Sequence, residues 1–89
     1  FAPAARFMGL CHEKGIGCGK SAADAIPWYR KGADMGDPGA AVLLGDAYEN
    51  GRGVKKDLDT ARRWYEAAAA GEGEEAETAR EALESMKRI

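Results

Sequence analysis

The sequence of 89 residues is poor in several features on which small proteins commonly depend. It contains two cysteines, Cys11 and Cys18, which are too few to build a disulfide-stabilised mini-domain. Its 13 Lys and Arg residues face 15 Asp and Glu residues, so it lacks the basic surplus that binds nucleic acid. No apolar run approaches the length of a membrane span. We therefore expect neither nucleic acid as a partner nor insertion into a membrane.

Glycine, in contrast, is abundant at 12 of 89 residues, and it marks an internal repeat. Gly45 lies 36 residues after Gly9, and the two halves align at this spacing without a gap. Self-similarity of this period is typical of repeat architectures, in which one helical unit stacks on the next. The recurring structural positions are Gly9, Gly15, Gly17, Trp28 and Tyr29 in the first copy and Gly45, Gly51, Gly53, Trp64 and Tyr65 in the second, with His12 in the place of Tyr48.

The hydrophobic period and the capping residues predict an all-α fold. Ser21, Asp37 and Asp57 are suited to cap helices near residues 22–35, 38–50 and 58–70, and further helices are expected near 4–14 and 74–87. Pro27 lies inside the second helix and predicts a late start or a kink there. The predicted organisation is a single repeat domain over 1–89, with units at 4–36 and 40–71 and a partial unit or capping helix at 72–89.

Small and large residues recur at matched positions, which indicates close packing of paired helices. A glycine in mid-helix costs roughly 1 kcal/mol of helix propensity relative to alanine. That cost is tolerable at Gly9 and Gly45 if it lets the second helix approach closely. Trp28 and Trp64 are expected to fill the space between successive pairs, and Tyr29 and Tyr65 each need a partner for the hydroxyl group.

From Ala40 to Ala69 the sequence reads Ala-Ala-x-x-Leu-Gly-x-x-Tyr-x-x-Gly-x-Gly-Val-x-x-Asp-x-x-x-Ala-x-x-Trp-Tyr-x-x-Ala-Ala. This pattern resembles the Sel1-like repeat, a relative of the tetratricopeptide repeat. The resemblance implies a right-handed α-α superhelix, or solenoid, here of two helix-turn-helix repeats and a C-terminal capping helix. It also implies a non-enzymatic adaptor without a cofactor, which brings proteins into complexes, often in bacteria.

The resemblance further implies where a partner would bind. In tetratricopeptide-like solenoids the first helix of each pair lines the concave side. The surface row on those helices mixes apolar and charged side chains, which suits an extended or helical peptide. The alternative is that these side chains are simply solvated. The predicted contact residues are Arg6, Leu10 and Glu13 in the first unit and Val42, Asp46 and Glu49 in the second.

Other chemistry has weaker support in the sequence. Cys11, His12 and Cys18 lack a fourth metal ligand at a suitable spacing, and a Cys11–Cys18 disulfide stays open. The segment ending Gly19-Lys20-Ser21 lacks the earlier glycine of a phosphate-binding loop and follows a predicted helix rather than a strand. The alternative function is that of cysteine-containing Sel1-like relatives linked to β-lactam binding or hydrolysis. A Ser-x-x-Lys motif would favour it, and none is present.

The compartment and the oligomeric state follow less directly from the sequence. The chain opens on repeat sequence at Phe1, with no signal-peptide pattern before it. This indicates a fragment or a mature region, so the bacterial cytoplasm, the periplasm and secretion all stay open. Two units and a partial third are close to the minimum for a stable array. We therefore expect modest stability, or self-association through apolar groups such as Phe1 and Phe7.

Overall fold

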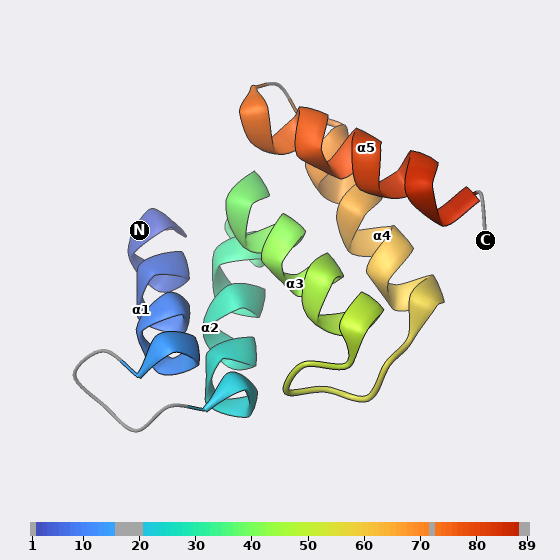
Figure 1. The fold of residues 1–89 in the computed structure, drawn as a ribbon. Coiled ribbons are helices and arrows are strands. Elements are labelled where there is room, and N and C mark those ends of the chain that lie inside the picture. The colour runs from blue at the N-terminus through green and yellow to red at the C-terminus, as the bar shows by residue number, and fades with distance from the viewer. Residues whose placement is uncertain (1, 16–20, 72, 88–89) are drawn as a thin grey trace.

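The computed structural model describes residues 2–15, 21–71 and 73–87, which form five α-helices and no β-strand. The helices are connected by short turns and loops, and Figure 1 shows them as two hairpins followed by a single helix that crosses the end of the array. Their bounds lie within two residues of the predicted ones. They are α1 (Ala2–Lys14), α2 (Ala22–Asp34), α3 (Pro38–Asn50), α4 (Leu58–Ala69) and α5 (Glu74–Lys87).

The helices pack as a curved array of pairs. α1 packs mainly on α2, α3 packs mainly on α4, and α5 contacts α4 and α3 as α3 contacts α2 and α1. The first helices touch one another directly, since α1 contacts α3 and α3 contacts α5. Within the described residues, α2 and α4 have no Cα atoms within 8 Å of each other. The first helices therefore lie closer to one another than the second helices do. The array bends toward α1, α3 and α5, and this side is its concave face.

Side-chain caps determine where three of the helices begin. The Ser21 side chain accepts a hydrogen bond from the Asp24 N–H, and the Asp37 carboxylate accepts one from the Gly39 N–H. Asp57 accepts from the N–H of Asp59 and from both the N–H and the hydroxyl of Thr60. These hydrogen bonds, with the Thr60 hydroxyl first, lower the pKa of the Asp57 carboxyl. All three predicted N-caps are confirmed.

One local expectation requires correction. α2 begins at Ala22 and continues through Pro27, so the late start is wrong, and the alternative, a kink at Pro27, stays a prediction. Proline removes the N–H that would bond the carbonyl of Ala23. Both residues are exposed, so water can solvate that carbonyl and the helix does not have to end there.

The core consists of two clusters that join along the array. The first contains Tyr29 and Leu44, the largest fully buried side chains, and the second is centred on Tyr65. Trp64 and Tyr48 pack against both clusters, as does Ala33. Trp64 therefore lies between successive pairs, as predicted, whereas Trp28 stacks on His12 of its own pair. The remaining buried members are Ile26 and six alanines, Ala25, Ala41, Ala47, Ala61, Ala68 and Ala79.

Candidate functional site

The repeat glycines allow an aromatic ring to lie close to the first helix of each pair. A Cβ atom on Gly45 would lie 2.7 Å from Cε1 of Tyr65, and one on Gly9 would lie 2.5 Å from Cε1 of Tyr29. Real Cβ atoms do not approach an aromatic carbon so closely. Both tyrosines are almost fully buried, at 1% exposure for Tyr29 and 3% for Tyr65. The glycines thus fix the distance between the two helices of each pair.

Each buried tyrosine is also tied to a glutamate on the facing helix. The Tyr29 hydroxyl donates to Oε2 of Glu13 at 3.1 Å, and the Tyr65 hydroxyl donates to Oε1 of Glu49 at 2.8 Å. Burial, together with the nearby glutamate, raises the pKa of both phenols above the ordinary value. Glycine, glutamate and tyrosine therefore form one structural unit, which recurs in the two repeats.

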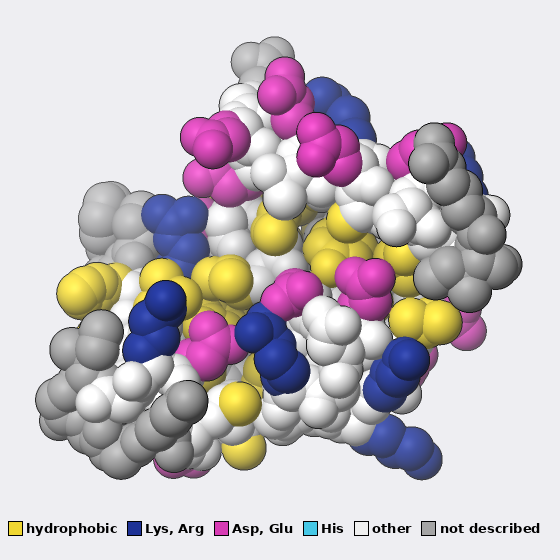
Figure 2. All heavy atoms as spheres, viewed as in Figure 1, with side chains coloured by type: hydrophobic (Ala, Val, Ile, Leu, Met, Phe, Trp, Pro, Cys, Tyr) yellow, Lys and Arg dark blue, Asp and Glu magenta, His cyan; other side chains and the backbone are white. Residues whose placement is uncertain are grey.

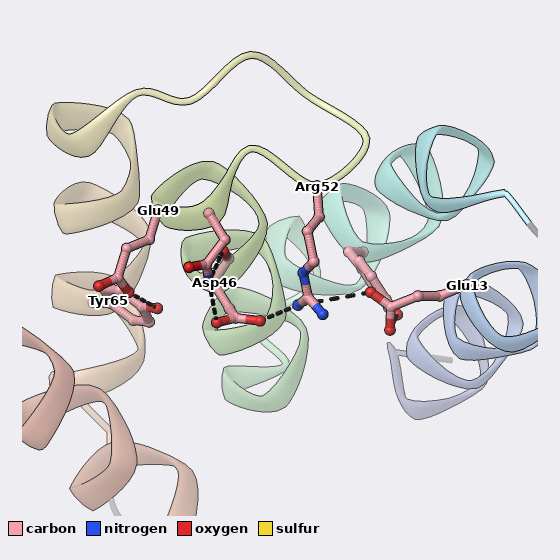
Figure 3. A network of polar contacts seen from close by, with 7 residues as sticks. Glu13, Asp46, Glu49, Arg52 and Tyr65 are labelled. Atoms are coloured by element: carbon pink, nitrogen blue, oxygen red, sulfur yellow. Dashed lines mark hydrogen bonds and ion pairs between the residues drawn. The ribbon is translucent and has the colours of Figure 1, made fainter.

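Arg52 connects the two repeats across the concave side. Its guanidinium forms ion pairs with Asp46 of α3 and, at 3.7 Å, with Oε1 of Glu13 of α1 (Figure 3). Asn50 donates a second hydrogen bond to Asp46, to Oδ1 at 2.9 Å. The row in Figure 3 runs from α1 across α3 to α4, so these polar groups are shared among three helices rather than isolated.

Arg6 makes a second connection, at the other end of the first helices. Its Nε lies 3.4 Å from Oδ2 of Asp37, whose side chain is 6% exposed, and its Nη1 lies 3.7 Å from Oε1 of Glu75. Asp37 belongs to the turn before α3, and Glu75 belongs to α5. Arg6 therefore joins α1 to the turn between the repeats and to the last helix.

A groove of about 410 Å³ lies between α1, α3 and α5 on the concave face. Its apolar part is formed by Leu10, Val42 and Leu43. Figure 2 shows hydrophobic side chains in this region, with carboxylates above and below them. The charged and polar lining comes from Arg6, Glu74, Glu75 and Thr78, and Gly39 completes it. The groove is open to solvent and mixes apolar surface with charge.

The structure thus distributes the six predicted contact residues over two settings. Arg6, Leu10 and Val42 line the groove. Glu13, Asp46 and Glu49 lie in the polar row that includes Arg52 and the two tyrosines. All six therefore lie on or beside the first helices, although four of them are also engaged in contacts within the chain.

The other predicted structural residues have individual surroundings. Gly15, Gly51 and Gly53 have positive φ angles, of 76°, 70° and 77°, which favour glycine, whereas Gly17 lies outside the described residues. Trp28 is half-buried and stacks on His12, with ring centroids 6.4 Å apart, and the Lys31 Nζ lies 5.7 Å from its ring. The tyrosines are thus buried more deeply than the tryptophans.

The possible chemical sites gain no second observation. No group of three or more His, Cys, Asp or Glu side chains within the described ranges is arranged to hold a metal ion. Cys11 is half-buried, while Cys18, and with it the question of a disulfide, lies outside the described residues, as does most of the Gly19-Lys20-Ser21 segment. In the part of the chain that is described, no helix is both long and apolar enough to cross a membrane.

Comparison with known proteins assigns the architecture. The model of the Sel1 repeat matches residues 2–37 and 38–72. The chain belongs to the Sel1 repeat family. In an alignment of 73 positions that covers 78% of this chain, it is 34% identical to chitin synthase regulator SKT5 of Saccharomyces cerevisiae, of which it spans 10%.

Solved structures agree with this assignment. A Sel1 repeat protein from Oxalobacter formigenes is 38% identical, with a TM-score of 0.76 over 78% of this chain and 28% of that one. A protective antigen of uropathogenic Escherichia coli displaying an SLR fold is also 38% identical, with a TM-score of 0.75 over 78% of this chain and 15% of that one. Cysteine rich protein B of Helicobacter pylori is 26% identical, with a TM-score of 0.79 over 86% and 59%.

These comparisons confirm the predicted resemblance and the all-α, right-handed solenoid of stacked helix pairs. Sel1 repeat proteins generally mediate protein–protein interactions, and scaffold homologues of this kind are generally non-enzymatic regulators. The chain spans about a tenth of the yeast relative and 28% of the Oxalobacter formigenes protein.

Sequence reasoning missed Arg52, which has the largest number of ionic partners on this face together with Arg6. A charged residue between two repeat glycines, Gly51 and Gly53, was the available signal. It also missed the link between Glu13 and Tyr29 and between Glu49 and Tyr65. Both pairs recur at the 36-residue spacing, so their partnership could have been inferred from the repeat.

Proposed function

We propose that this chain is a binding scaffold that holds a protein or peptide partner on its concave face and catalyses no reaction. The observation that carries the proposal is the open groove of about 410 Å³ between α1, α3 and α5. Leu10, Val42 and Leu43 supply apolar contact area there, and the neighbouring charges supply orientation. A peptide lying along the first helices would contact both repeats at once.

Two further observations support a scaffold. The ion pairs of Arg6 and Arg52 hold the first helices at fixed positions. The groove is therefore preformed, and ligand binding does not have to include the cost of ordering it. The yeast relative is named as a regulator of another protein, chitin synthase. Only that class of role, acting on another protein, is extended to this chain.

The test begins with partners recovered from the native lysate by the intact protein. Leu10, Val42 and Asp46 are then replaced together, by Gln, Gln and Asn. These changes remove apolar contact area and one charge while leaving the buried Gly–Tyr contacts intact. We expect the affinity for a recovered partner to fall by about tenfold or more, because central apolar contacts dominate binding energy.

The matched control changes the convex side, where Lys31, Arg63 and Ala67 are exposed. Replacing these three by Gln should leave affinity unchanged, and circular dichroism should be the same for both variants. If the control weakens binding and the groove variant does not, the partner site lies on the convex side and the proposal is wrong.

A further inference from the structure

The concave face carries many more carboxylates than cations. Arg6 and Arg52 supply guanidinium groups to the groove and the polar row, and Lys14 lies beside Glu13 and Arg52 at one margin. Figure 2 shows the acidic side chains on both sides of the hydrophobic patch. Among the described residues, six carboxylates line the groove, pair with one of the two arginines or belong to the polar row of Figure 3. They are Glu13, Asp37, Asp46, Glu49, Glu74 and Glu75.

Both guanidinium groups are already engaged within the chain. Arg6 lies between the carboxylates of Asp37 and Glu75, and Arg52 lies between those of Asp46 and Glu13. A carboxylate on a ligand would compete with these internal partners, for example with Asp37 for Arg6. The buried Asp37 would then lose its one ion-pair partner among the described residues, which is costly. The arginines are therefore poorly placed to recruit an acidic ligand.

Several carboxylates, in contrast, are available to a ligand. Glu74 lines the groove, is exposed, and forms no ion pair within the described part of the chain. Glu75 shares Arg6 with Asp37 at 3.7 Å and keeps 43% of its side chain exposed. Glu49 accepts a hydrogen bond from Tyr65 and has no cation against it among the described residues. Glu74 and Glu75 line the groove beside the apolar strip made by Leu10, Val42 and Leu43, and Glu49 lies farther along α3 in the polar row.

We infer that the groove takes a cationic amphipathic segment of a partner protein, in which Lys or Arg residues are interleaved with aliphatic ones. The aliphatic residues would cover Leu10, Val42 and Leu43, and the cationic heads would reach Glu74 and Glu75 at the α5 side of the groove. Opposite charge across an interface favours the right partner and suppresses the wrong one. This inference rests on the proposed function, since it specifies the partner of the same face.

The experiment selects ligands without assuming one. A displayed library of random peptides of about twelve residues, which spans about 40 Å when extended, is selected on the full chain. Binders are then retested on a variant with Leu10→Gln and Val42→Gln. These changes remove most of the apolar strip without changing the net charge. Peptides that lose binding on this variant are groove-dependent, and their composition is compared with that of the starting library.

We expect groove-dependent peptides to be enriched in Lys and Arg together with Leu, Ile or Val. If they are neutral or acidic, the concave site stands and the inference about its partner is wrong. If no selected peptide depends on the groove, the proposed function fails and the inference fails with it. The two failures are therefore distinguishable.

A charge-matched pair of variants locates the contact. Glu74→Gln removes a carboxylate from the groove, whereas Glu84→Gln removes one from an exposed position of α5 that does not line it. We expect Glu74→Gln to weaken a groove-dependent cationic peptide severalfold in fluorescence anisotropy, more at low salt than at high salt, and Glu84→Gln to change its affinity little. Equal effects of the two variants would mean that the peptide is attracted by the net charge of the chain and not by Glu74. That result would overturn the inference.

Discussion

At the scale of single residues, the two glycines at the centre of the helix pairs are the most tightly constrained positions. Gly45 leaves room for the ring of Tyr65, and Gly9 leaves room for that of Tyr29. Glycine lowers the intrinsic stability of a helix, so its presence here is explained by the packing of the ring and not by the helix itself. The same residue type is used differently at Gly71, where a Cβ would make an ordinary contact of 3.6 Å.

The first prediction follows from this difference. Gly45→Ala should destabilise the protein by about 1–3 kcal/mol, because the added methyl group would be driven into a buried ring. This is expected although alanine raises helix propensity by about 1 kcal/mol. Gly71→Ala is the control and should change stability by less than about 0.5 kcal/mol. Urea denaturation of both variants measures the difference, and a Gly45→Ala variant as stable as the parent would contradict the packing.

The second prediction concerns the buried phenols. Burial and a neighbouring glutamate raise the pKa of Tyr29 and Tyr65 above the ordinary value of about 10. Because the folded-state pKa is the higher one, the stabilisation is complete below the unfolded-state value and declines as pH rises above it. In a Tyr48→Phe variant, which keeps only these two tyrosines, phenolate absorbance should therefore appear together with the loss of helical circular dichroism. Phenolate formation near pH 10 in a fully helical protein would show that the phenols are accessible.

At the scale of helices and loops, the loop of the second repeat contacts the start of α2 in the first. Gly53 has a φ angle of 77°, and a Cβ atom there would lie 2.5 Å from the carbonyl carbon of Ala22. Gly51 has a similar φ angle of 70°, but its nearest neighbour to an added Cβ, on Lys56, would be 3.4 Å away. A side chain at either glycine would strain the backbone. Only a side chain at Gly53 would also collide with the other repeat.

The third prediction uses this pair. Gly51→Ala should cost about 1–2 kcal/mol, the strain of a left-handed conformation in a residue with a Cβ. Gly53→Ala should cost about 1–3 kcal/mol more, because the methyl group also meets the backbone of the preceding repeat. Thermal unfolding of the two variants, compared with the parent, measures both terms. Equal destabilisation would mean that the loop at Gly53 does not pack closely against the backbone of α2.

The sequence predicts these elements better than it predicts their contacts. Caps such as Ser21 and Asp57 act within a few residues, so the bounds of the helices follow from local chemistry. Repetition over 36 residues also indicates which helices pair. The ion pairs of Arg6 could not be predicted, because Glu75 reaches it only through the curvature of the whole array. The predicted contact row thus stays a prediction, and the ion pairs that its charges form within the chain did not follow from the sequence.

At the scale of the whole molecule, stability depends on contacts between neighbouring units. Phe7 is 57% exposed on α1, so self-association through this end stays a prediction, and Phe1 lies outside the described residues. The ion pair between Arg6 and the nearly buried Asp37 is the connection with the highest expected cost of loss. The Arg62–Asp59 pair, in contrast, lies within one turn of α4 on the surface.

The fourth prediction compares these two ion pairs. Arg6→Gln should destabilise the protein by about 2–3 kcal/mol, since it leaves the buried Asp37 carboxylate without a cation. The expected cost is below the 3–5 kcal/mol of a fully buried pair because Arg6 is about a third exposed. Arg62→Gln should change stability by about 0.5 kcal/mol or less. Calorimetric unfolding tests both, and similar effects would show that Asp37 is solvated when Arg6 is absent.

The contact between Arg6 and Glu75 relates the bend of the array to the distance between two helices. The two residues belong to the first and the last helix, and α1 and α5 have no Cα atoms within 8 Å of each other in the described residues. Apart from this side-chain contact, the separation of these two helices depends on the bend of the entire array. A pair of spectroscopic labels on α1 and α5 would serve as a gauge of that bend, and it would register a ligand that widens or closes the concave face.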